Sequence, residues 1–410
     1  MPTLVIVGAS LAGLRAAEAA RRSGWDDELI VVGEEGHMPY TRPPLSKELL
    51  TTAAASVADH LLPAQVEATW LLGERATGIE RDTRRLKLAG GEPLAYERLV
   101  IATGCRARRW SGPGAELAGL HLIRHAEDAL ALRSALALGS RVAIVGAGFI
   151  GCEVASSARN LELEVSLFDI ASTPMPVLGP LLGERCAAMH RAHGVDLHLG
   201  VSIAALHGES GRVRAIELAD GARHEADVVV VALGAVPCTD WLADSGLAVE
   251  RGVRCDATLT VEGDPDLLAA GDIAEWPHPL AGGRLIRIEH WTNAAEQGAH
   301  AGRNAVLTAS ERKPYIGIPS FWSDQYGIRI QALGLPHLAD RHHIVEETDD
   351  GSRLVAVAER DGVLVGVVAF DGARRLPFYR RRLGSPLDLE ALRAELAEDP
   401  QALGVAAVSA

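Results

Sequence analysis

The amino-acid sequence predicts an α/β protein with two similar parallel-sheet domains and a small α+β domain at the C-terminal end. The main observation is a repeat. An apolar strand, a glycine-rich turn, an alanine-rich helix, a second strand and an acidic residue follow one another from Thr3, and again from Arg141. The length of 410 residues also favours two or three domains over one. Strand-helix-strand units of this kind build parallel sheets covered by helices.

The first copy of the repeat occupies the N-terminal end of the chain. Residues 4–7 are continuously apolar, which is typical of a strand buried on both faces. A glycine-rich turn over residues 8–13 follows, then a predicted helix over residues 14–23 and a strand over residues 28–32. The copy ends at Glu34.

The second copy has the same order and nearly the same spacing. Residues 142–145 form the apolar strand and residues 146–151 the glycine-rich turn, and a helix runs to about Asn160. Residues 164–168 form the next strand, which ends at Asp169. Two Rossmann-like mononucleotide-binding units are therefore predicted.

Each turn carries, or nearly carries, the pattern Gly-x-Gly-x-x-Gly that binds a dinucleotide pyrophosphate. The first glycine allows the tight turn, the second lets the backbone approach the pyrophosphate, and the third lets helix and strand pack. The second copy has all three, whereas Ser10 takes the middle place in the first, where a small side chain is tolerated. The helix N-terminus then faces the phosphates.

The acidic residues that end the two copies, Glu34 and Asp169, are placed to accept hydrogen bonds from a ribose. A carboxylate at this position repels the 2′-phosphate of NADP, and no arginine occurs in residues 170–173 to neutralise it. The sequence therefore favours NADH at the second unit.

Further strands complete the three domains. Residues 84–88, a turn at Gly90-Gly91 and residues 98–103 predict a hairpin insert in the first domain. Residues 213–218 and 227–233 repeat this plan in the second. The small third domain is predicted from strands that begin at Leu354 and surround Asp361-Gly362, and from a helix over residues 387–397. A run of basic residues, Arg374 to Arg382, lies between these strands and the helix.

Composition excludes several classes of function. The net charge of −14 argues against non-specific binding of nucleic acid, which requires a basic surface. The longest apolar stretch, residues 228–236, is far too short to cross a membrane, and the chain begins directly with a strand, so we expect a cytoplasmic protein without membrane insertion. The five cysteines contain no Cys-x-x-Cys pair and no metal-ligand spacing. They predict reduced structural thiols and no metal site.

Several segments resemble one family of flavoproteins. Residues 39–47, Pro-Tyr-Thr-Arg-Pro-Pro-Leu-Ser-Lys, and residues 321–326, Phe-Trp-Ser-Asp-Gln-Tyr, resemble signatures of ferredoxin reductases of the putidaredoxin-reductase type, which include rubredoxin reductases and dioxygenase reductase components. Residues 97–104, 270–272 and 288–294 also match, and the similarity extends to about residue 383.

This resemblance implies a glutathione-reductase-like arrangement with FAD in the first unit and NADH in the second. The FAD domain would comprise residues 1–110 and 238–319, the NADH domain residues 111–237, and a C-terminal domain capping the flavin residues 320–410. Together, the motifs and the resemblance predict contacts with FAD for Gly8, Ser10, Ala12, Gly13, Glu34, Arg42, Pro44, Lys47, Ala76, Thr103, Gly104, Arg124, Gly271, Asp272 and Trp291. The predicted NAD contacts are Gly146, Gly148, Phe149, Ile150, Gly151, Glu153, Asp169 and Gly234.

Three side chains are predicted to act at the reacting centre. Pro43 and Pro44 fix the start of a helix and so place Lys47, whose positive charge would stabilise reduced flavin. Glu153, expected on the first helical turn after Gly151, resembles a family glutamate facing the nicotinamide, and we expect it to form an ion pair with Lys47. Trp322 would exclude water from the hydride path. Asp272, expected between a strand and a helix, would bind the ribityl chain.

The cysteine positions indicate where the electrons go. Related disulfide reductases use a cysteine pair and peroxide-reducing relatives a cysteine near residues 41–47, but this chain has none there. The electrons must then leave to an external acceptor, and a [2Fe-2S] ferredoxin serving a haem-thiolate monooxygenase or a ring-hydroxylating dioxygenase fits best. We expect a monomer or weak dimer. Such carriers are usually acidic, so the basic docking candidates are Arg374, Arg375, Arg380, Arg381 and Arg382.

Two other functions remain open from the sequence. An NADH oxidase or quinone reductase would turn over rapidly with oxygen or quinone alone. A flavin-bearing sensor or interaction protein would instead keep its reduced flavin as a complex with the oxidised nicotinamide, as in proteins of the apoptosis-inducing-factor sort.

Overall fold

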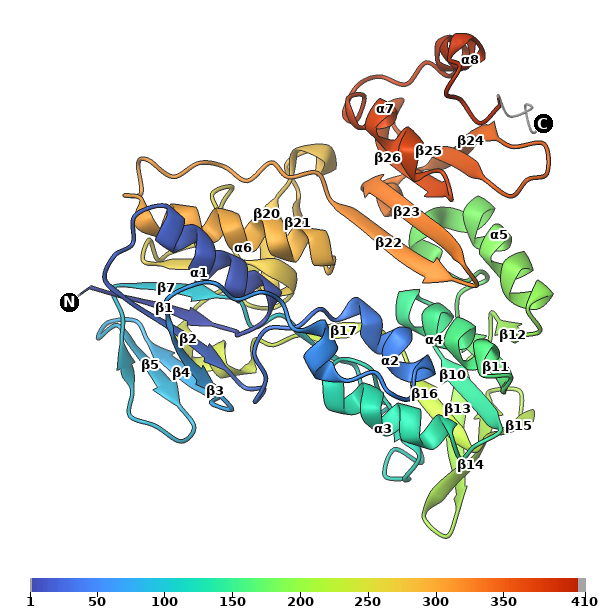
Figure 1. The fold of residues 1–410 in the computed structure, drawn as a ribbon, viewed down its shortest axis with the longest axis horizontal. Coiled ribbons are helices and arrows are strands. Elements are labelled where there is room, and N and C mark those ends of the chain that lie inside the picture. The colour runs from blue at the N-terminus through green and yellow to red at the C-terminus, as the bar shows by residue number, and fades with distance from the viewer. Residues whose placement is uncertain (1, 405–410) are drawn as a thin grey trace. The chain divides into compact units, whose positions relative to one another are not determined.

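The computed structural model describes residues 2–404, which divide into two compact units. Unit 1 comprises residues 1–41, 57–106 and 236–320, and unit 2 comprises residues 42–56, 107–235 and 321–410. Each unit contains one five-stranded parallel sheet of the predicted kind (Figure 1). Within residues 2–404, no helix is long and apolar enough to cross a membrane.

Unit 1 is built on a parallel sheet with the strand order β19-β7-β1-β2-β3. Its strands are β1 (Thr3–Val7), β2 (Glu28–Gly33), β3 (Thr69–Leu72), β7 (Arg98–Ile101) and β19 (Leu267–Ala269). An antiparallel insert of β4 (Ala76–Glu80), β5 (Arg85–Leu88) and β6 (Leu94–Ala95) confirms the predicted hairpin, although β7 lies in the parallel sheet. The remaining elements are α1 (Leu11–Arg22), β18 (Val253–Arg254), β20 (Ala274–Pro277), β21 (Leu285–Arg287) and α6 (Trp291–Val306). The unit boundaries fall within two short paired strands, β8 (Cys105–Ala107) and β17 (Ala235–Pro237).

The parallel sheet of unit 2 has the order β12-β11-β10-β16-β9. Its strands are β9 (Leu120–His121), β10 (Arg141–Val145), β11 (Glu164–Asp169), β12 (Asp196–Leu199) and β16 (Val228–Val231). Its helices are α2 (Glu48–Thr51), α3 (Ala126–Leu136), α4 (Phe149–Asn160) and α5 (Gly179–Ala192). An antiparallel layer of β13 (Ile203–Glu209), β14 (Arg212–Leu218) and β15 (Arg223–Glu225) packs on one face of this sheet.

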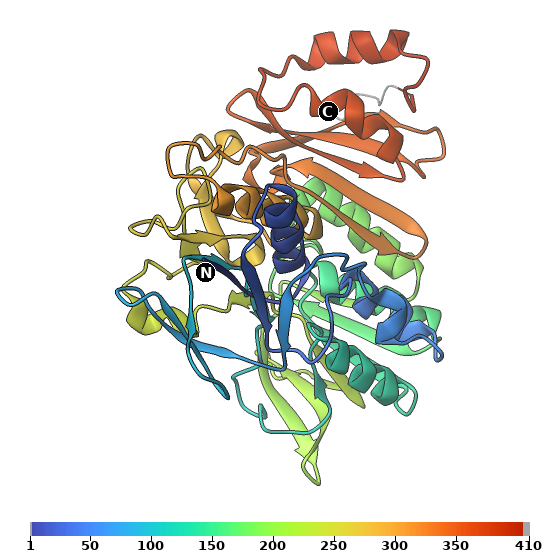
Figure 2. The same cartoon turned by 60° about the vertical axis from the view of Figure 1, so that its left-hand side comes forward.

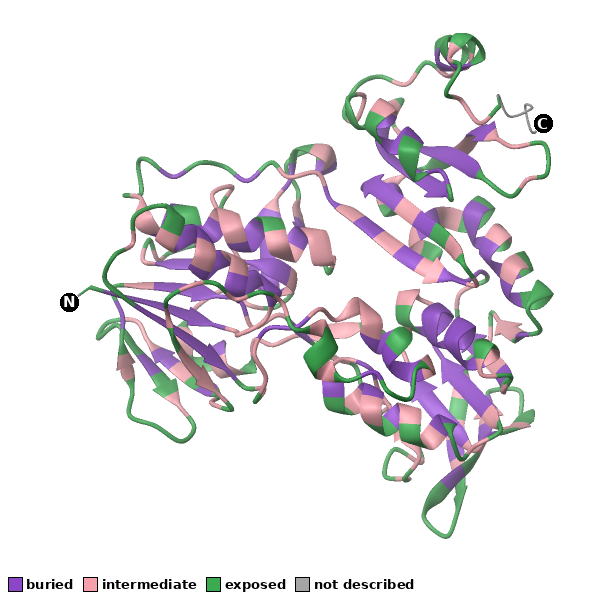
Figure 3. Cartoon of the chain, in the orientation of Figure 1, coloured by how far each residue is buried: buried purple, intermediate pink, exposed green. Residues whose placement is uncertain are grey.

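The C-terminal part of unit 2 is a separate antiparallel sheet with two short helices. The strand order is β22-β23-β26-β25-β24, and three of these strands, including the one that carries the Phe-Trp-Ser-Asp-Gln motif, precede the predicted start at Leu354. The elements are β22 (Ser320–Gln325), β23 (Ile328–Gly334), β24 (Arg341–Glu347), β25 (Leu354–Arg360), β26 (Val363–Phe370), α7 (Leu376–Arg380) and α8 (Leu389–Glu398). Strands β1, β7, β10, β16, β25 and β26 are buried along most of their length (Figure 3), whereas β3, β9 and β12, at the edges of the two parallel sheets, contain no buried residue.

Both helices of the repeat begin earlier than a simple turn-then-helix division suggests. α1 starts at Leu11 and α4 at Phe149, so the last three residues of each glycine-rich motif already form the first helical turn. A Cβ on Gly13 would lie 1.9 Å from the carbonyl oxygen of Gly8, and a Cβ on Gly151 would lie 1.8 Å from that of Gly146. Only glycine allows each helix to start so close to its strand.

Helices α1 and α6 lie side by side in unit 1, as both views show (Figures 1 and 2). Gly298 and Gly302 of α6 face the backbone of α1, because a Cβ on either would lie 2.2 Å from a carbonyl oxygen, that of Ala12 or Ala16. The two backbones are therefore in direct contact, which positions the start of α1.

This contact predicts the effect of adding one methyl group. Gly298→Ala should destabilise the protein by about 1 to 3 kcal/mol, although alanine normally favours a helix by about 1 kcal/mol, because the new Cβ overlaps the Ala12 carbonyl. Chemical unfolding measures the change. Gly36→Ala is the matched control, since no heavy atom lies within 4 Å of its added Cβ, and it should change the free energy of unfolding by less than about 0.5 kcal/mol. Equal effects of the two substitutions would contradict this packing.

Candidate functional site

The two glycine-rich turns pack closely against the neighbouring strand ends, and the second leaves open space at its middle glycine. Gly8 and Gly146 have φ of +121° and +108°, and a Cβ on either would collide with a carbonyl oxygen of the neighbouring strand end, Ala102 or Ala232. By contrast, no heavy atom lies within 4 Å of a Cβ built on Gly148, the residue that caps the N-terminus of α4. Ser10 holds the equivalent cap of α1. The backbone thus leaves room for a phosphate group at the N-terminus of α4.

Asp169 also organises the second turn. One carboxylate oxygen accepts a hydrogen bond from the backbone N–H of Ala147 at 2.5 Å, and the other accepts one from Ala171 at 2.7 Å. Each oxygen has a second acceptor position, so the group can still receive a ribose hydroxyl. Glu34, its counterpart in unit 1, is exposed at the end of β2.

The predicted ion pair between Lys47 and Glu153 is present. Lys47 Nζ lies 2.6 Å from Glu153 Oε2, and the glutamate side chain is only 5% exposed. Glu153 also accepts hydrogen bonds from Ser46 Oγ at 2.5 Å and Ser323 Oγ at 2.7 Å. A buried carboxylate is costly unless it is paired and hydrogen-bonded, and these three donors meet that requirement inside unit 2.

Three segments supply this cluster. Lys47 lies between a short 3-10 helix, Pro43–Ser46, and α2, while Glu153 is the fifth residue of α4 and so lies on its second turn, one turn later than expected. Ser323 lies on β22, where burial alternates: Phe321, Ser323 and Gln325 are buried, and Trp322 and Asp324 are half-buried. Sequence reasoning missed Ser46 and Ser323, although both lie within the quoted motifs.

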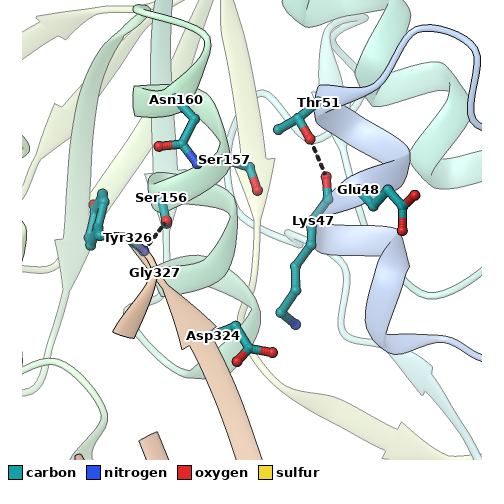
Figure 4. A pocket seen from close by; sticks show the side chains of 9 residues that line it. All are labelled: Lys47, Glu48, Thr51, Ser156, Ser157, Asn160, Asp324, Tyr326 and Gly327. Atoms are coloured by element: carbon teal, nitrogen blue, oxygen red, sulfur yellow. Dashed lines mark hydrogen bonds between the residues drawn. The ribbon is translucent and has the colours of Figure 1, made fainter. Parts of the chain in front are cut away.

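A pocket in unit 2 opens beside Lys47 (Figure 4). Ser156, Asp324 and Tyr326 lie opposite Lys47 in this view, and the backbone N–H of Tyr326 donates to Ser156 Oγ at 2.8 Å. Tyr326 is held by a histidine that does not line the pocket: His190 Nδ1 lies 2.8 Å from the Tyr326 hydroxyl. Burial lowers the pKa of His190 to about 4. This histidine is therefore neutral near pH 7 and fixes the tyrosine by a neutral hydrogen bond. The full lining is Lys47, Glu48, Thr51, Ser156, Ser157, Asn160, Asp324, Tyr326 and Gly327.

The other predicted site residues fall in both units. Phe149 meets Phe321 edge to face, with ring centroids 4.7 Å apart, and Ile150 beside it is exposed. Arg42 Nη1 donates to the carbonyl oxygen of Arg124 at 2.6 Å. Unit 2 also contains Pro44, Gly234 and Trp322, and unit 1 contains Ala12, Ala76, Thr103, Gly104, Gly271, Asp272 and Trp291.

The structure corrects the expected surroundings of Asp272. It lies in a one-turn 3-10 helix, Gly271–Ile273, which follows β19 but leads into strand β20 and not into a helix. Gly271 has φ of +80°, and its N–H donates to Gln297 Oε1 of α6 at 2.9 Å. The long helix near Asp272 is thus α6, which begins at Trp291, later in the chain.

The prediction that Arg375 belongs to the docking surface is wrong, because this residue is buried. Arg375 is 4% exposed, and its guanidinium pairs with Glu346 and Asp399, each at 2.8 Å. Arg382 is half-buried over the Phe378 ring and paired with Glu395. Arg374, Arg380 and Arg381 are exposed. The run of basic residues is divided because Arg375, the last residue of a 3-10 helix that precedes α7 (Ala373–Arg375), is buried, whereas Arg374 beside it is exposed.

All five cysteines are free thiols, and only Cys238 is not buried. Burial raises the pKa of Cys186 to about 12 and the pKa of Cys152 well above its ordinary value. Four of the five thiols therefore lie in the protein interior, where the thiolate form is disfavoured.

Comparison with known families identifies the chain. Residues 2–298 match the pyridine nucleotide-disulphide oxidoreductase family, and residues 320–403 match the reductase C-terminal family. The chain belongs to the pyridine nucleotide-disulphide oxidoreductase family. This assignment confirms the predicted oxidoreductase class, the α/β fold with two Rossmann-like domains, and FAD with a pyridine nucleotide as the cofactors of the family.

Similar proteins are ferredoxin reductases. The chain is 34% identical over 393 residues to the ferredoxin–NAD(+) reductase component of the biphenyl dioxygenase system of Paraburkholderia xenovorans, covering 95% of both chains. It superimposes with a TM-score of 0.89, at 30% identity and 98% coverage of both, on the ferredoxin reductase for the CYP199A2 system from Rhodopseudomonas palustris. Superposition on putidaredoxin reductase in its covalent complex with putidaredoxin gives a TM-score of 0.85 at 29% identity, covering 93% of this chain and 92% of that one. The resemblance seen in the sequence is confirmed.

Burial of the thiols predicts their reactivity. Because the thiolate is the reactive form and a pKa of about 12 leaves almost none at pH 7.5, Cys186 should resist iodoacetamide in the folded protein, as should the other buried cysteines. Mass spectrometry after brief labelling should find modification at Cys238 alone. The same treatment in denaturant, the control, should modify all five, and fast native labelling of Cys152 or Cys186 would contradict the burial.

Proposed function

We propose that this protein is an NADH-dependent ferredoxin reductase that supplies electrons to a [2Fe-2S] ferredoxin of a haem-thiolate monooxygenase or ring-hydroxylating dioxygenase. The observation that carries the proposal is the full-length similarity to ferredoxin reductases, at 34% identity over 95% of the chain. The free, mostly buried cysteines support it, because they leave an external acceptor as the destination of the electrons.

The residues fit the two cofactors in the following way. The N-terminus of α1 and its glycine turn would hold the FAD pyrophosphate, the N-terminus of α4 would hold that of NADH, and Asp169 would accept hydrogen bonds from the NADH ribose. The FAD domain comprises residues 1–110 and 238–319, the NADH domain residues 111–237 and the C-terminal domain residues 320–410. When bound, FAD accepts a hydride from NADH and releases electrons singly.

The protein contributes position and charge to this reaction. The Lys47 ammonium, held by Glu153 at 2.6 Å, provides a fixed positive charge, which favours negative charge on the reduced ring. Ser46 and Ser323 hold the Glu153 carboxylate, and through it they orient Lys47. Trp322 excludes water. We also propose a cytoplasmic location and docking of the carrier near the exposed Arg374, Arg380 and Arg381.

The function is tested by NADH-driven cytochrome c reduction with and without a [2Fe-2S] ferredoxin. The rate should rise strongly with ferredoxin, and NADH should be preferred to NADPH because Asp169 repels the 2′-phosphate. Oxygen consumption and quinone reduction without ferredoxin should stay slow. Rapid turnover with oxygen or quinone that ferredoxin does not increase would replace this proposal by an NADH oxidase or quinone reductase.

The role of Lys47 is tested separately from the acceptor. Lys47→Met should slow reduction of bound FAD by NADH about 10- to 100-fold in stopped-flow absorbance, because it removes the fixed positive charge. Lys87→Met is the matched control, since Lys87 is an exposed lysine on β5 paired with Glu80. Reduction of the Lys47 variant at the rate of the control would reject the assigned role.

A further inference from the structure

A cluster of metal-binding side chains lies at one edge of the parallel sheet of unit 2. Asp196 and His198 project from the same face of the edge strand β12, because they are two residues apart. His224 of β15 reaches the same place from the antiparallel layer. One ligand atom from each of the three residues lies within 4.8 Å of the other two.

A buried aromatic ring positions both imidazoles. Phe168 of β11, which is 1% exposed, stacks on His198 with centroids 4.7 Å apart and planes at 10°. The same ring meets His224 edge to face at 5.1 Å. The two imidazoles are themselves 4.3 Å apart at 61°. Because Phe168 belongs to the core, the histidines rest on a rigid support before any ligand binds.

We propose that Asp196, His198 and His224 bind one divalent transition-metal ion of the zinc class. Two imidazole nitrogens and one carboxylate oxygen are zinc ligands at about 2.0 to 2.2 Å, so ligand atoms around a tetrahedral ion are about 3.4 Å apart. The ligand atoms now lie within 4.8 Å of one another, so they must approach by about 1.4 Å at most to reach this spacing. Two imidazoles also disfavour calcium and magnesium, which prefer oxygen.

The surroundings leave room for a fourth ligand. The Asp196 side chain is 65% exposed and that of His198 is 21% exposed, so water reaches the cluster. His198 Nε2 already lies 2.7 Å from Asp196 Oδ2, and an ion would replace this hydrogen bond with two coordinate bonds. The site lies apart from the Lys47–Glu153 pair, on different elements, and the electron-transfer reaction does not require it. A bound ion would join β12 to β15, which belong to different sheets.

The test is metal binding by the FAD-loaded protein without a histidine tag, after treatment with a chelator. Titration with Co2+, followed by its visible absorption bands beyond those of the flavin, and equilibrium dialysis with Zn2+ should each give one ion per chain. Zn2+ should also raise the melting temperature, by about 2 to 4 °C, because the ion stabilises only the folded arrangement. His198→Ala and His224→Ala should each weaken binding at least about tenfold.

Two controls make the result decisive. His207→Ala, on β13 of the same antiparallel layer and paired with Glu217, should bind the ion as the parent protein does. NADH oxidation by the His198 and His224 variants shows that they are folded. Absence of binding at a 1:1 ratio, or binding that persists unchanged in His198→Ala and so belongs to thiols elsewhere, would overturn the proposal.

Discussion

Unit 2 depends on one buried carboxylate, that of Glu153. Its partners come from sites far away along the chain: Ser46 is 107 residues before it and Ser323 is 170 residues after it. Each donor satisfies an acceptor that would otherwise be costly at 5% exposure. This requirement, together with the hydrogen bonds of Arg133 to the carbonyls of residues 49, 52 and 55, groups residues 42–56 with unit 2 and not with the rest of the N-terminal segment. Glu153 in turn holds Lys47 Nζ at 2.6 Å.

A second constraint, repeated in both units, is the close approach of helix and strand at the glycine turns. In each copy a Cβ on the first glycine would collide with a carbonyl oxygen at the end of the neighbouring strand. A Cβ on the last glycine would collide with the carbonyl oxygen of the first glycine. In unit 1 the constraint extends to a second helix, because Gly298 and Gly302 place α6 against the backbone of α1. Helix N-termini held this closely have little freedom, so their N–H groups form a fixed anion site.

The sequence predicts the parts of the structure that follow from local chemistry. The repeat, the glycine positions and the Lys47–Glu153 pair could all be read from spacing or from the family motifs. Contacts made between distant segments could not. The burial of Arg375 depends on Glu346, a strand residue with no special local signal. A helix was expected directly after Asp272, but strand β20 follows it, and the helix that contacts this turn is α6, which begins only at Trp291. His198 and His224 come together only through the pairing of β11 with β12 and the packing of β15, although Asp196-x-His198 was a usable signal.

Burial, more than chemical type, separates the groups that act from those that only pack. Cys152 lies next to Glu153 on α4, yet its thiol is fully buried and its pKa is raised, so it adds no redox chemistry to the site. Lys47 remains 21% exposed beside a pocket. A side chain that can carry charge therefore reaches the pocket, whereas the oxidisable side chain on the same helix does not. This arrangement suits a protein that passes electrons outward without storing them on its own sulfur.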